Sequence, residues 1–355
     1  MITTQELPIV DASAYFLARL EGRDASAQAA QLGIDIKDAC HAVGMFYLVG
    51  YDIDQTLIDR VMQKTAWFFA SDQGDKDAIS IKKSPQFRGY GLLKNYRDWR
   101  EQIHIGVESS LPEIAAGDSG LVKTDHYWQL WGKNQWPSTS GSDEFRSSVL
   151  AYFAAVEALA RDILTLLAQA LDKPSNFFTE RMKDRPYLLM KAMSYLPQEK
   201  RGEDSTQMGV TAHCDWSWLT FLVQDQVGGL EAQDIDGNWR KVTPLPNSIV
   251  VNTGELLEIE TGGYLRASPH RVINERIDRQ RFSVPVFINP ALDAPILPGS
   301  ADGASVCSSA SGDEAHVHKV IKPGTNLGSF VFGDSEYERK AKGVWCYAPE
   351  CVTAL

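Results

Sequence analysis

The first half of the chain places apolar residues at the spacing of amphipathic helices. Apolar positions recur every three to four residues in 36–43 and 55–69, which predicts a helix over each segment, and the apolar run 44–49 between them is typical of a buried strand. A longer helix is predicted over 142–171, ending before Pro174 because proline disfavours helix in the residue before it. Its apolar stripe comprises Phe145, Val149, Phe153, Val156, Leu159, Ile163 and Leu167.

The pattern changes after Pro186, where short apolar and β-branched runs replace the helical spacing. Turn signals such as Asp236-Gly237 separate these runs. The predicted strands are 187–195, 218–225, 229–233, 239–242, 248–252, 270–274, 281–289 and 329–332. Many short strands after a helical half predict an α+β protein with a jelly-roll core, a double-stranded β-helix, that helices buttress.

Length permits two domains, but no linker or internal repeat supports a division. We therefore expect one compact unit, in which a mainly helical region, 1–180, packs on a jelly-roll core, 181–355. The small, polar segment 299–313 is expected to be an exposed loop or a lid over the barrel. The apolar segment 343–347 is expected to dock on the protein or on a partner subunit.

The charge and composition of the chain exclude several classes of binding partner. The 355 residues include 35 basic and 46 acidic side chains, a net charge of −11, which argues against nucleic acid or an anionic membrane as partner. No apolar run reaches the roughly 18–20 residues of a membrane span, and the N-terminus resembles no signal peptide. Five scattered cysteines suit neither a disulfide framework nor a CxxC zinc site. We expect a soluble cytoplasmic protein, a monomer or a homodimer.

Three residues have the chemistry of a metal site. His213 and Asp215 stand two apart on an extended segment, so both side chains face the same way, and His270 begins another predicted strand. Two imidazoles and one carboxylate form the facial triad of non-haem Fe(II) oxygenases, which leaves coordination positions open for a co-substrate and O2. Taken singly, a hydrogen-bonded His-x-Asp pair and a core histidine remain the ordinary alternatives.

A second pair has the chemistry of a carboxylate receptor. Arg281 and Ser283 alternate with Phe282, so the guanidinium and the hydroxyl share one face of a strand. Arginine binds a carboxylate bidentately and a hydroxyl adds a further hydrogen bond. Since a buried arginine without an anionic ligand would be costly, the pair predicts an anionic co-substrate inside the barrel.

Together these motifs resemble the Fe(II)/2-oxoglutarate-dependent dioxygenases of the isopenicillin N synthase-like superfamily. The segments 7–11, 39–50, 88–90, 132–137 and 250–256 match further stretches typical of that family, so the resemblance covers nearly the whole chain. A family turn of sequence Asn-His-Gly is replaced here by Gly50-Tyr51-Asp52.

The resemblance implies roles for particular residues and a reaction. Fe(II) would be held by His213, Asp215 and His270, and 2-oxoglutarate by Arg281, Ser283 and Tyr195. Tyr195 lacks the asparagine that accompanies it in relatives, and a tyrosine packed in the barrel is its alternative interpretation. The implied activity is O2-dependent oxidation of an unactivated C–H bond in a small organic molecule, by hydroxylation, desaturation or cyclisation, with release of succinate and CO2. Specialised-metabolite or amino-acid-derived metabolism is the expected setting.

Substrate residues are harder to identify from sequence. Arg88 could bind a substrate carboxylate in a loop over the active site, although a structural arginine is an equal alternative. The hypothesis includes Arg88, Tyr90, His104, Trp218 and Phe287. For the aromatic members, a place in the hydrophobic core is the competing interpretation.

Two other functions compete with a 2-oxoglutarate-dependent oxygenase. An isopenicillin N synthase-like oxidase would use Fe(II) and O2 without 2-oxoglutarate, yet carry the same motifs. A non-catalytic scaffold would keep the fold but bind no iron. A zinc hydrolase is disfavoured because no HExxH-type glutamate accompanies the histidines.

Overall fold

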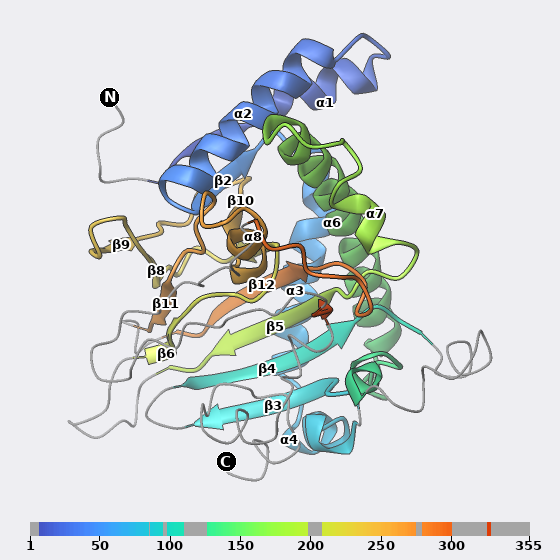
Figure 1. The fold of residues 1–355 in the computed structure, drawn as a ribbon. Helices are drawn as coiled ribbons and strands as arrows, with labels where there is room; N and C mark the ends of the chain where they lie inside the picture. Colours follow the sequence, from blue (N-terminus) through green and yellow to red (C-terminus); the bar gives the residue numbers. More distant parts are fainter. Residues whose placement is uncertain are drawn as a thin grey trace, which may run out of the picture.

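The computed structural model describes residues 7–84, 86–94, 98–109, 126–197, 208–274, 279–299 and 325–327. The predicted strand 329–332, the predicted loop 299–313 beyond Gly299 and the tail segment 343–347 lie outside these residues. The helices, shown in Figure 1, are α1 (Ser13–Leu20), α2 (Ser26–Ala42), α3 (Gln55–Phe69), α4 (Gln73–Ala78), α6 (Ser142–Ala170), α7 (Thr179–Met182) and α8 (Glu255–Glu260), with short 3-10 turns at Ile81–Lys83 and His126–Leu130.

Two β-sheets form the centre of the molecule. The larger has eight strands in the order β1-β2-β10-β7-β12-β5-β4-β3, and the smaller has four in the order β6-β11-β8-β9. Their bounds are β1 Ile9–Asp11, β2 Met45–Val49, β3 Gly89–Lys94, β4 Trp99–Gly106, β5 Leu189–Tyr195, β6 Met208–His213, β7 Leu219–Gln224, β8 Leu230–Gln233, β9 Trp239–Lys241, β10 Ile249–Thr253, β11 His270–Ile273 and β12 Arg281–Ile288. Two facing sheets of largely antiparallel strands form the expected jelly roll.

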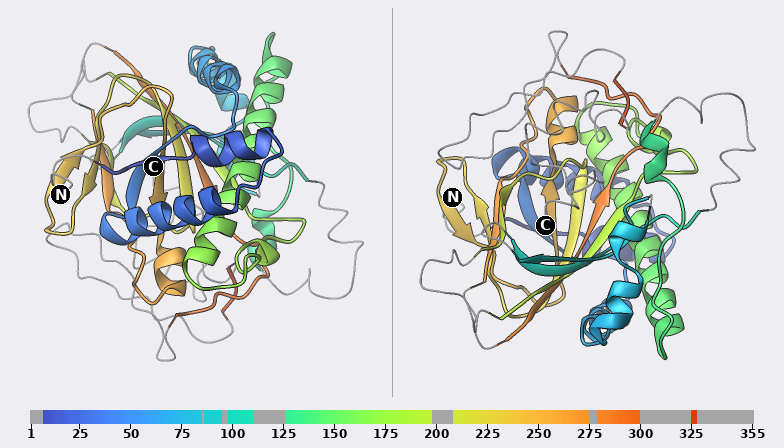
Figure 2. Two further views of the ribbon diagram at one scale, coloured as in Figure 1. Left: turned by 90° about the horizontal axis from the view of Figure 1, so that it is seen from above. Right: turned by 90° about the horizontal axis from the view of Figure 1, so that it is seen from below.

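The helices of the first half cover one face of the large sheet. Contacts join α6 to α2 and α3, and both α3 and α6 to β12. All seven residues of the predicted α6 stripe are buried. Figure 2 shows this helical layer on one side of the large sheet and the small sheet on the other. The helices therefore leave the opposite face of the large sheet free to meet the small sheet.

A smaller apolar cluster lies between the two sheets. It joins Met45 and Tyr47 of β2 and Met193 of β5 to Val210 of β6 and Val272 of β11. This cluster packs the sheets together at one end of the barrel. The remaining part of the same inner face carries the polar residues described below.

The first half contains two strands that the apolar pattern does not predict. β3 and β4 pair with each other, and β4 pairs with β5, so these two strands extend the large sheet. Arg88 directly precedes β3 in an irregular segment, as the expectation of a loop there requires, and it is buried. Strands from both 1–180 and 181–355 share this sheet.

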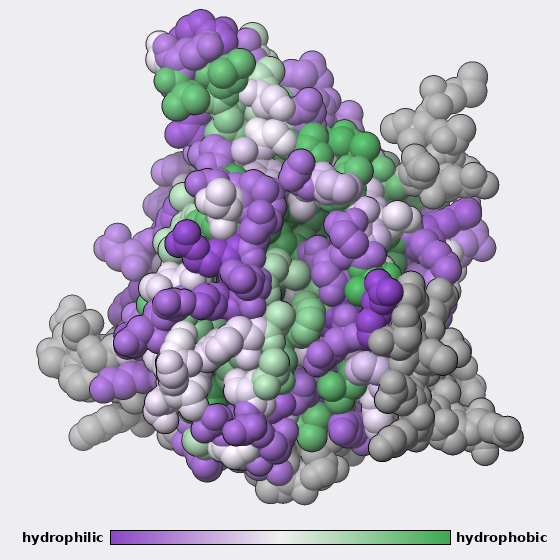
Figure 3. All heavy atoms as spheres, turned by 180° about the vertical axis from the view of Figure 1, so that it is seen from behind, coloured by the Kyte–Doolittle hydropathy of each residue, from purple (hydrophilic) through white to green (hydrophobic). Residues whose placement is uncertain are grey.

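The face of the molecule seen from behind is mostly hydrophilic. Polar side chains dominate there, and apolar ones show in small groups between them (Figure 3). In the described part of the chain, no helix combines the length and the apolar character needed to cross a membrane.

Candidate metal centre

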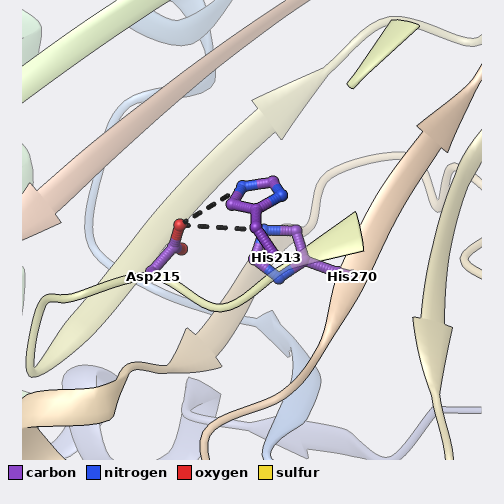
Figure 4. A group of neighbouring side chains, drawn as sticks. All are labelled: His213, Asp215 and His270. Atoms are coloured by element: carbon purple, nitrogen blue, oxygen red, sulfur yellow. Dashed lines mark ion pairs between the residues drawn. The ribbon is translucent and has the colours of Figure 1, made fainter. Parts of the chain in front are cut away.

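Two neighbouring strands bring the histidines together. His213 ends β6, His270 begins β11, and the two residues are direct partners in the antiparallel register. Their ring centroids are 4.3 Å apart. Asp215 follows the end of β6, and its Oδ1 lies 3.8 Å from His213 Nε2 and 3.7 Å from His270 Nε2. Figure 4 shows the three side chains pointing toward one another. Their candidate ligand atoms all lie within 4.8 Å of one another.

Backbone carbonyl groups orient both imidazoles. His213 Nδ1 lies 2.9 Å from the carbonyl oxygen of Thr211, and His270 Nδ1 lies 2.9 Å from that of Ser268. A carbonyl oxygen can only accept, so each Nδ1 carries the proton and each Nε2 presents a lone pair to the centre. Burial lowers the pKa of His213 to about 4, with a further contribution from the neighbouring His270. His213 is therefore a neutral donor at neutral pH.

Two side chains of the large sheet hold the carboxylate of Asp215. Its Oδ2 accepts hydrogen bonds from Thr220 Oγ1 at 2.6 Å and from Asn252 Nδ2 at 2.8 Å. Burial opposes the charged form, but the two imidazoles and these hydrogen bonds outweigh it and lower the pKa of Asp215. Oδ1 is thus left to face the two Nε2 atoms as an ionised oxygen donor.

The chain approaches itself closely at Gly254. A Cβ at this position would lie 2.1 Å from the carbonyl oxygen of Ser217 and 2.8 Å from that of Asp215. The backbone N–H of Glu255 donates to the same Asp215 carbonyl at 2.7 Å. The start of α8 therefore fixes the backbone that carries Asp215.

The donor set fits a transition metal. Two imidazole nitrogens and one carboxylate oxygen converge, which is the donor set of the facial triad of non-haem Fe(II). Mg²⁺ and Ca²⁺ prefer sites made of oxygen atoms. The residues present therefore fit Fe(II).

A buried positive pocket lies on the inner face of the large sheet. Arg281 on β12 is the register partner of Tyr195 on β5, and its guanidinium carbon lies 4.6 Å from the centroid of that ring. Ser283 Oγ donates to Tyr195 Oη at 3.3 Å, and Arg281 Nη1 donates to Ser283 Oγ at 3.4 Å. All three side chains are at most 1% exposed.

The guanidinium of Arg281 is incompletely satisfied. Its Nη2 donates to Gln224 Oε1 at 2.7 Å, while the buried Nε has no hydrogen-bond partner among the described residues. Those residues also provide no ion pair for Arg281. A buried cation with a free donor, beside two hydroxyl groups, fits the carboxylate of an anionic ligand.

Three of the five candidate substrate residues gather around the other end of this face. Arg88 lies over Gly106 of β4, where a Cβ would be 2.1 Å from the guanidinium. His104 of β4 pairs with Lys191 of β5, whose ammonium lies 5.0 Å from the ring centroid of Phe287. Arg88, His104 and Phe287 are all buried.

The structure does not bring the other two candidates into this group. Tyr90 alternates with Gly89, the partner of His104, and so faces the outer side of the sheet, where its hydroxyl donates to Glu101. Trp218 is fully buried against α7 and α8: its indole donates to Glu260 at 3.0 Å and lies 4.8 Å from the guanidinium of Arg181. Both aromatic side chains thus have contacts within the protein core, which fits the competing interpretation of these residues as core aromatics.

Three site residues were absent from the sequence-based hypothesis. Thr220 and Asn252 hold Asp215, and Gln224 holds Arg281. Asn252 falls in the segment 250–256 that resembles the family, which was its only signal. Thr220 and Gln224 point inward on β7 by strand alternation, but which side chains they meet depends on the pairing of distant strands.

Comparisons with known proteins agree with this geometry. Residues 187–290 match the model of the 2OG-Fe(II) oxygenase superfamily, and 7–139 match that of the N-terminal region of non-haem dioxygenases in morphine synthesis. A probable iron/ascorbate oxidoreductase of Dictyostelium discoideum is 30% identical, over 81% of this chain and 82% of its own. A 2-oxoglutarate-Fe(II) type oxidoreductase of Emericella nidulans is 32% identical, over 79% of each chain. A full-length Neurospora crassa protein, solved in complex with alpha-KG and 5-formyluracil, superposes with a TM-score of 0.70 at 22% identity, covering 93% of this chain and 97% of its own.

Proposed function

This chain belongs to the 2OG-Fe(II) oxygenase superfamily, and we propose that His213, Asp215 and His270 bind its Fe(II) while Arg281 binds the distal carboxylate of its co-substrate. The enzyme is a 2-oxoglutarate-dependent oxygenase. The observation that carries the residue assignment is the convergence of two Nε2 atoms and one carboxylate oxygen within 4.8 Å.

The reaction balances as substrate R–H, 2-oxoglutarate and O2 giving R–OH, succinate and CO2. O2 is the oxidant: it accepts two electrons from 2-oxoglutarate and two from the substrate, and Fe(II) bound at this site would activate it for that transfer. His213 and His270 would present Nε2 to the metal because their Nδ1 protons are bound to backbone carbonyls. Asp215 contributes the one negative charge, held in place by Thr220 and Asn252.

The pocket of Arg281 would orient the co-substrate. The guanidinium and the hydroxyls of Ser283 and Tyr195 offer donors to one carboxylate, and their complete burial keeps competing water away. The keto-acid half of the co-substrate would then be available to the metal centre, whose histidines lie on the small sheet. The relatives named as 2-oxoglutarate-dependent enzymes support this function over an oxidase that uses no 2-oxoglutarate.

We also propose the setting in which the enzyme acts. Its substrate is a small organic molecule of specialised or amino-acid-derived metabolism, and its outcome is hydroxylation, desaturation or cyclisation. It acts in the cytoplasm as a monomer or a homodimer, without a nucleic-acid or membrane partner. The net charge of −11 supports the part of this proposal that excludes a nucleic-acid or anionic-membrane partner.

An anaerobic titration tests the assignment. Fe(II) followed by 2-oxoglutarate should produce the visible charge-transfer band of an Fe(II)–keto acid chelate in the wild-type protein. His213→Ala should lose bound iron and the band, whereas Arg281→Met should keep iron but need about tenfold or more 2-oxoglutarate, the cost of a lost charge-assisted contact.

His41→Ala serves as the matched control, because His41 is an exposed histidine outside the site. Its band should equal that of the wild type. Iron retained by His213→Ala would refute the ligand assignment, and an unchanged 2-oxoglutarate requirement in Arg281→Met would refute the co-substrate pocket.

A further inference from the structure

A second buried cation lies on the inner face, apart from Arg281. Arg88 is 2% exposed, and its guanidinium covers the backbone of Gly106 at the end of β4. Any side chain at Gly106 would overlap it, since a Cβ there would be 2.1 Å from Nη2 and 2.6 Å from Nε. The absence of a side chain at Gly106 thus gives the guanidinium room on the face that His104 shares.

The protein satisfies Arg88 only in part. Its Nη2 donates to the carbonyl oxygen of Leu130 at 3.0 Å, and its Nε is buried without a hydrogen-bond partner among the described residues. No carboxylate of those residues forms an ion pair with it. A buried guanidinium that lacks an anion is costly, so this arrangement calls for a negatively charged ligand.

The surroundings add positive charge. Burial holds the pKa of His104 well below its usual value, and the charges of Lys191, Arg88 and Arg100 lower it further. The imidazole of His104 therefore adds no negative charge beside Arg88. Arg100 is paired with Asp98, whereas Arg88 is a buried cation without an ion pair among the described residues.

An aromatic wall connects Arg88 with the metal centre. The guanidinium carbon lies 5.8 Å from the ring centroid of Tyr187, which is stacked on Trp216 at 5.8 Å. Trp216 is stacked in turn on Phe287, with centroids 6.2 Å apart and planes 10° from parallel. Trp216 directly follows Asp215 in the sequence, so this stack of aromatic rings connects a proposed iron ligand with the guanidinium of Arg88.

We propose that Arg88 binds the carboxylate of the substrate, a small organic acid whose apolar part lies against Trp216 and Phe287. This inference rests on the proposed oxygenase function and specifies its substrate class. A planar guanidinium with a free Nε suits the fork geometry of a carboxylate. The distance between cation and metal centre then selects which C–H bond of the acid is oxidised.

A matched library tests the substrate class. Small aromatic and aliphatic carboxylic acids, each paired with its neutral carboxamide, are screened on the Fe(II)-loaded enzyme for stimulated succinate release. Their binding is measured by anaerobic calorimetry in the presence of 2-oxoglutarate. The stimulating members should be acids, with binding at least tenfold tighter than that of the paired amide.

Arg88→Gln should weaken binding of the acid at least tenfold and reduce the preference for acid over amide. Its affinity for 2-oxoglutarate should remain that of the wild type, which also shows that the variant is folded. Arg88→Lys, which keeps the charge without the fork, should fall between the two. Arg60→Gln, a change at an exposed arginine of α3, is the control and should match the wild type.

These experiments distinguish a wrong substrate class from a wrong proposed function. A library in which only amides stimulate, or in which no acid binds, overturns the substrate class while 2-oxoglutarate binding still supports an oxygenase. Equal losses for acid and amide in Arg88→Gln would assign Arg88 a structural role. A wild-type enzyme that binds no 2-oxoglutarate would refute the proposed function itself.

Discussion

At the scale of single residues, the metal centre depends on side chains that never reach the metal. Thr220 and Asn252 both donate to Oδ2 of Asp215, and so decide which oxygen faces the histidines. His-x-Asp, the second His and Arg-x-Ser could be identified from sequence because each is a local pattern or a family motif. The partners of Asp215 could not, because they come from β7 and β10, whose pairing is set by the whole sheet.

Removing one of these partners should weaken metal binding. Asn252→Ala leaves Oδ2 of Asp215 with Thr220 alone, so we expect Fe(II) affinity to fall by about 10- to 100-fold. Anaerobic competition with a chelator measures the dissociation constant. Asn238→Ala, at an exposed asparagine in a turn, is the control, and an affinity equal to it would contradict the role of Asn252.

His104 should make the stability of the metal-free protein depend on pH. Burial, followed by the charges of Lys191, Arg88 and Arg100, lowers its pKa well below 6.5 in the folded state. The unfolded chain binds a proton at His104 below pH ~6.5 and the folded protein does not, so stability falls as pH falls. The slope from this residue approaches about 1.4 kcal/mol per pH unit.

The measurement is urea unfolding at pH 7.5 and pH 5.5, with a chelator present. His104→Gln should show a smaller loss of unfolding free energy between these two conditions than the wild type. His41→Gln should retain the wild-type loss. Equal losses in all three proteins would mean that His104 is protonated in the folded state.

At the scale of elements, predictability followed the regularity of the apolar pattern. The helices α3 and α6 and most strands after Pro186 were predicted within a few residues, because each buries one apolar face. β4 was not predicted, since its inner face carries Arg100, Gln102 and His104 and therefore lacks apolar alternation. The polar side chains that β4 directs to the inner face are the reason why its sequence shows no apolar alternation.

A buried ion pair joins two short helices beneath the site. Arg181 of α7 contacts both oxygens of Glu260 of α8, at 2.5 and 2.8 Å, and Trp218 donates to the same carboxylate. Removing the carboxylate leaves a buried guanidinium and an indole N–H without their partner. Glu260→Ala should therefore reduce the free energy of unfolding by about 3–5 kcal/mol.

Denaturant unfolding checks this value against a surface pair. Glu157 and Arg161 form an i,i+4 ion pair on α6 whose side chains are 27% and 32% exposed. Glu157→Ala should cost at most about 0.5 kcal/mol. A similar small cost for Glu260→Ala would show that water replaces the lost contacts around Arg181.

At the scale of the whole molecule, the proposed ligands connect the two sheets. His213 and His270 belong to the small sheet, whereas Tyr195 and Arg281 belong to the large one. Asp215 lies between them, anchored through Thr220 and Asn252 to the large sheet. Metal and co-substrate would therefore fasten together two layers that otherwise meet through a modest apolar cluster.

Such a connection predicts stabilisation in two separable steps. A ligand that binds only the folded state adds about 2.7 kcal/mol to the unfolding free energy at one hundred times its dissociation constant. Thermal unfolding under anaerobic conditions should show Tm rising with Fe(II) and rising again with 2-oxoglutarate. Arg281→Met should keep the first rise and lose most of the second, whereas His213→Ala should lose both. If 2-oxoglutarate raised the Tm of Arg281→Met as much as that of the wild type, the co-substrate would not span the two sheets through this arginine.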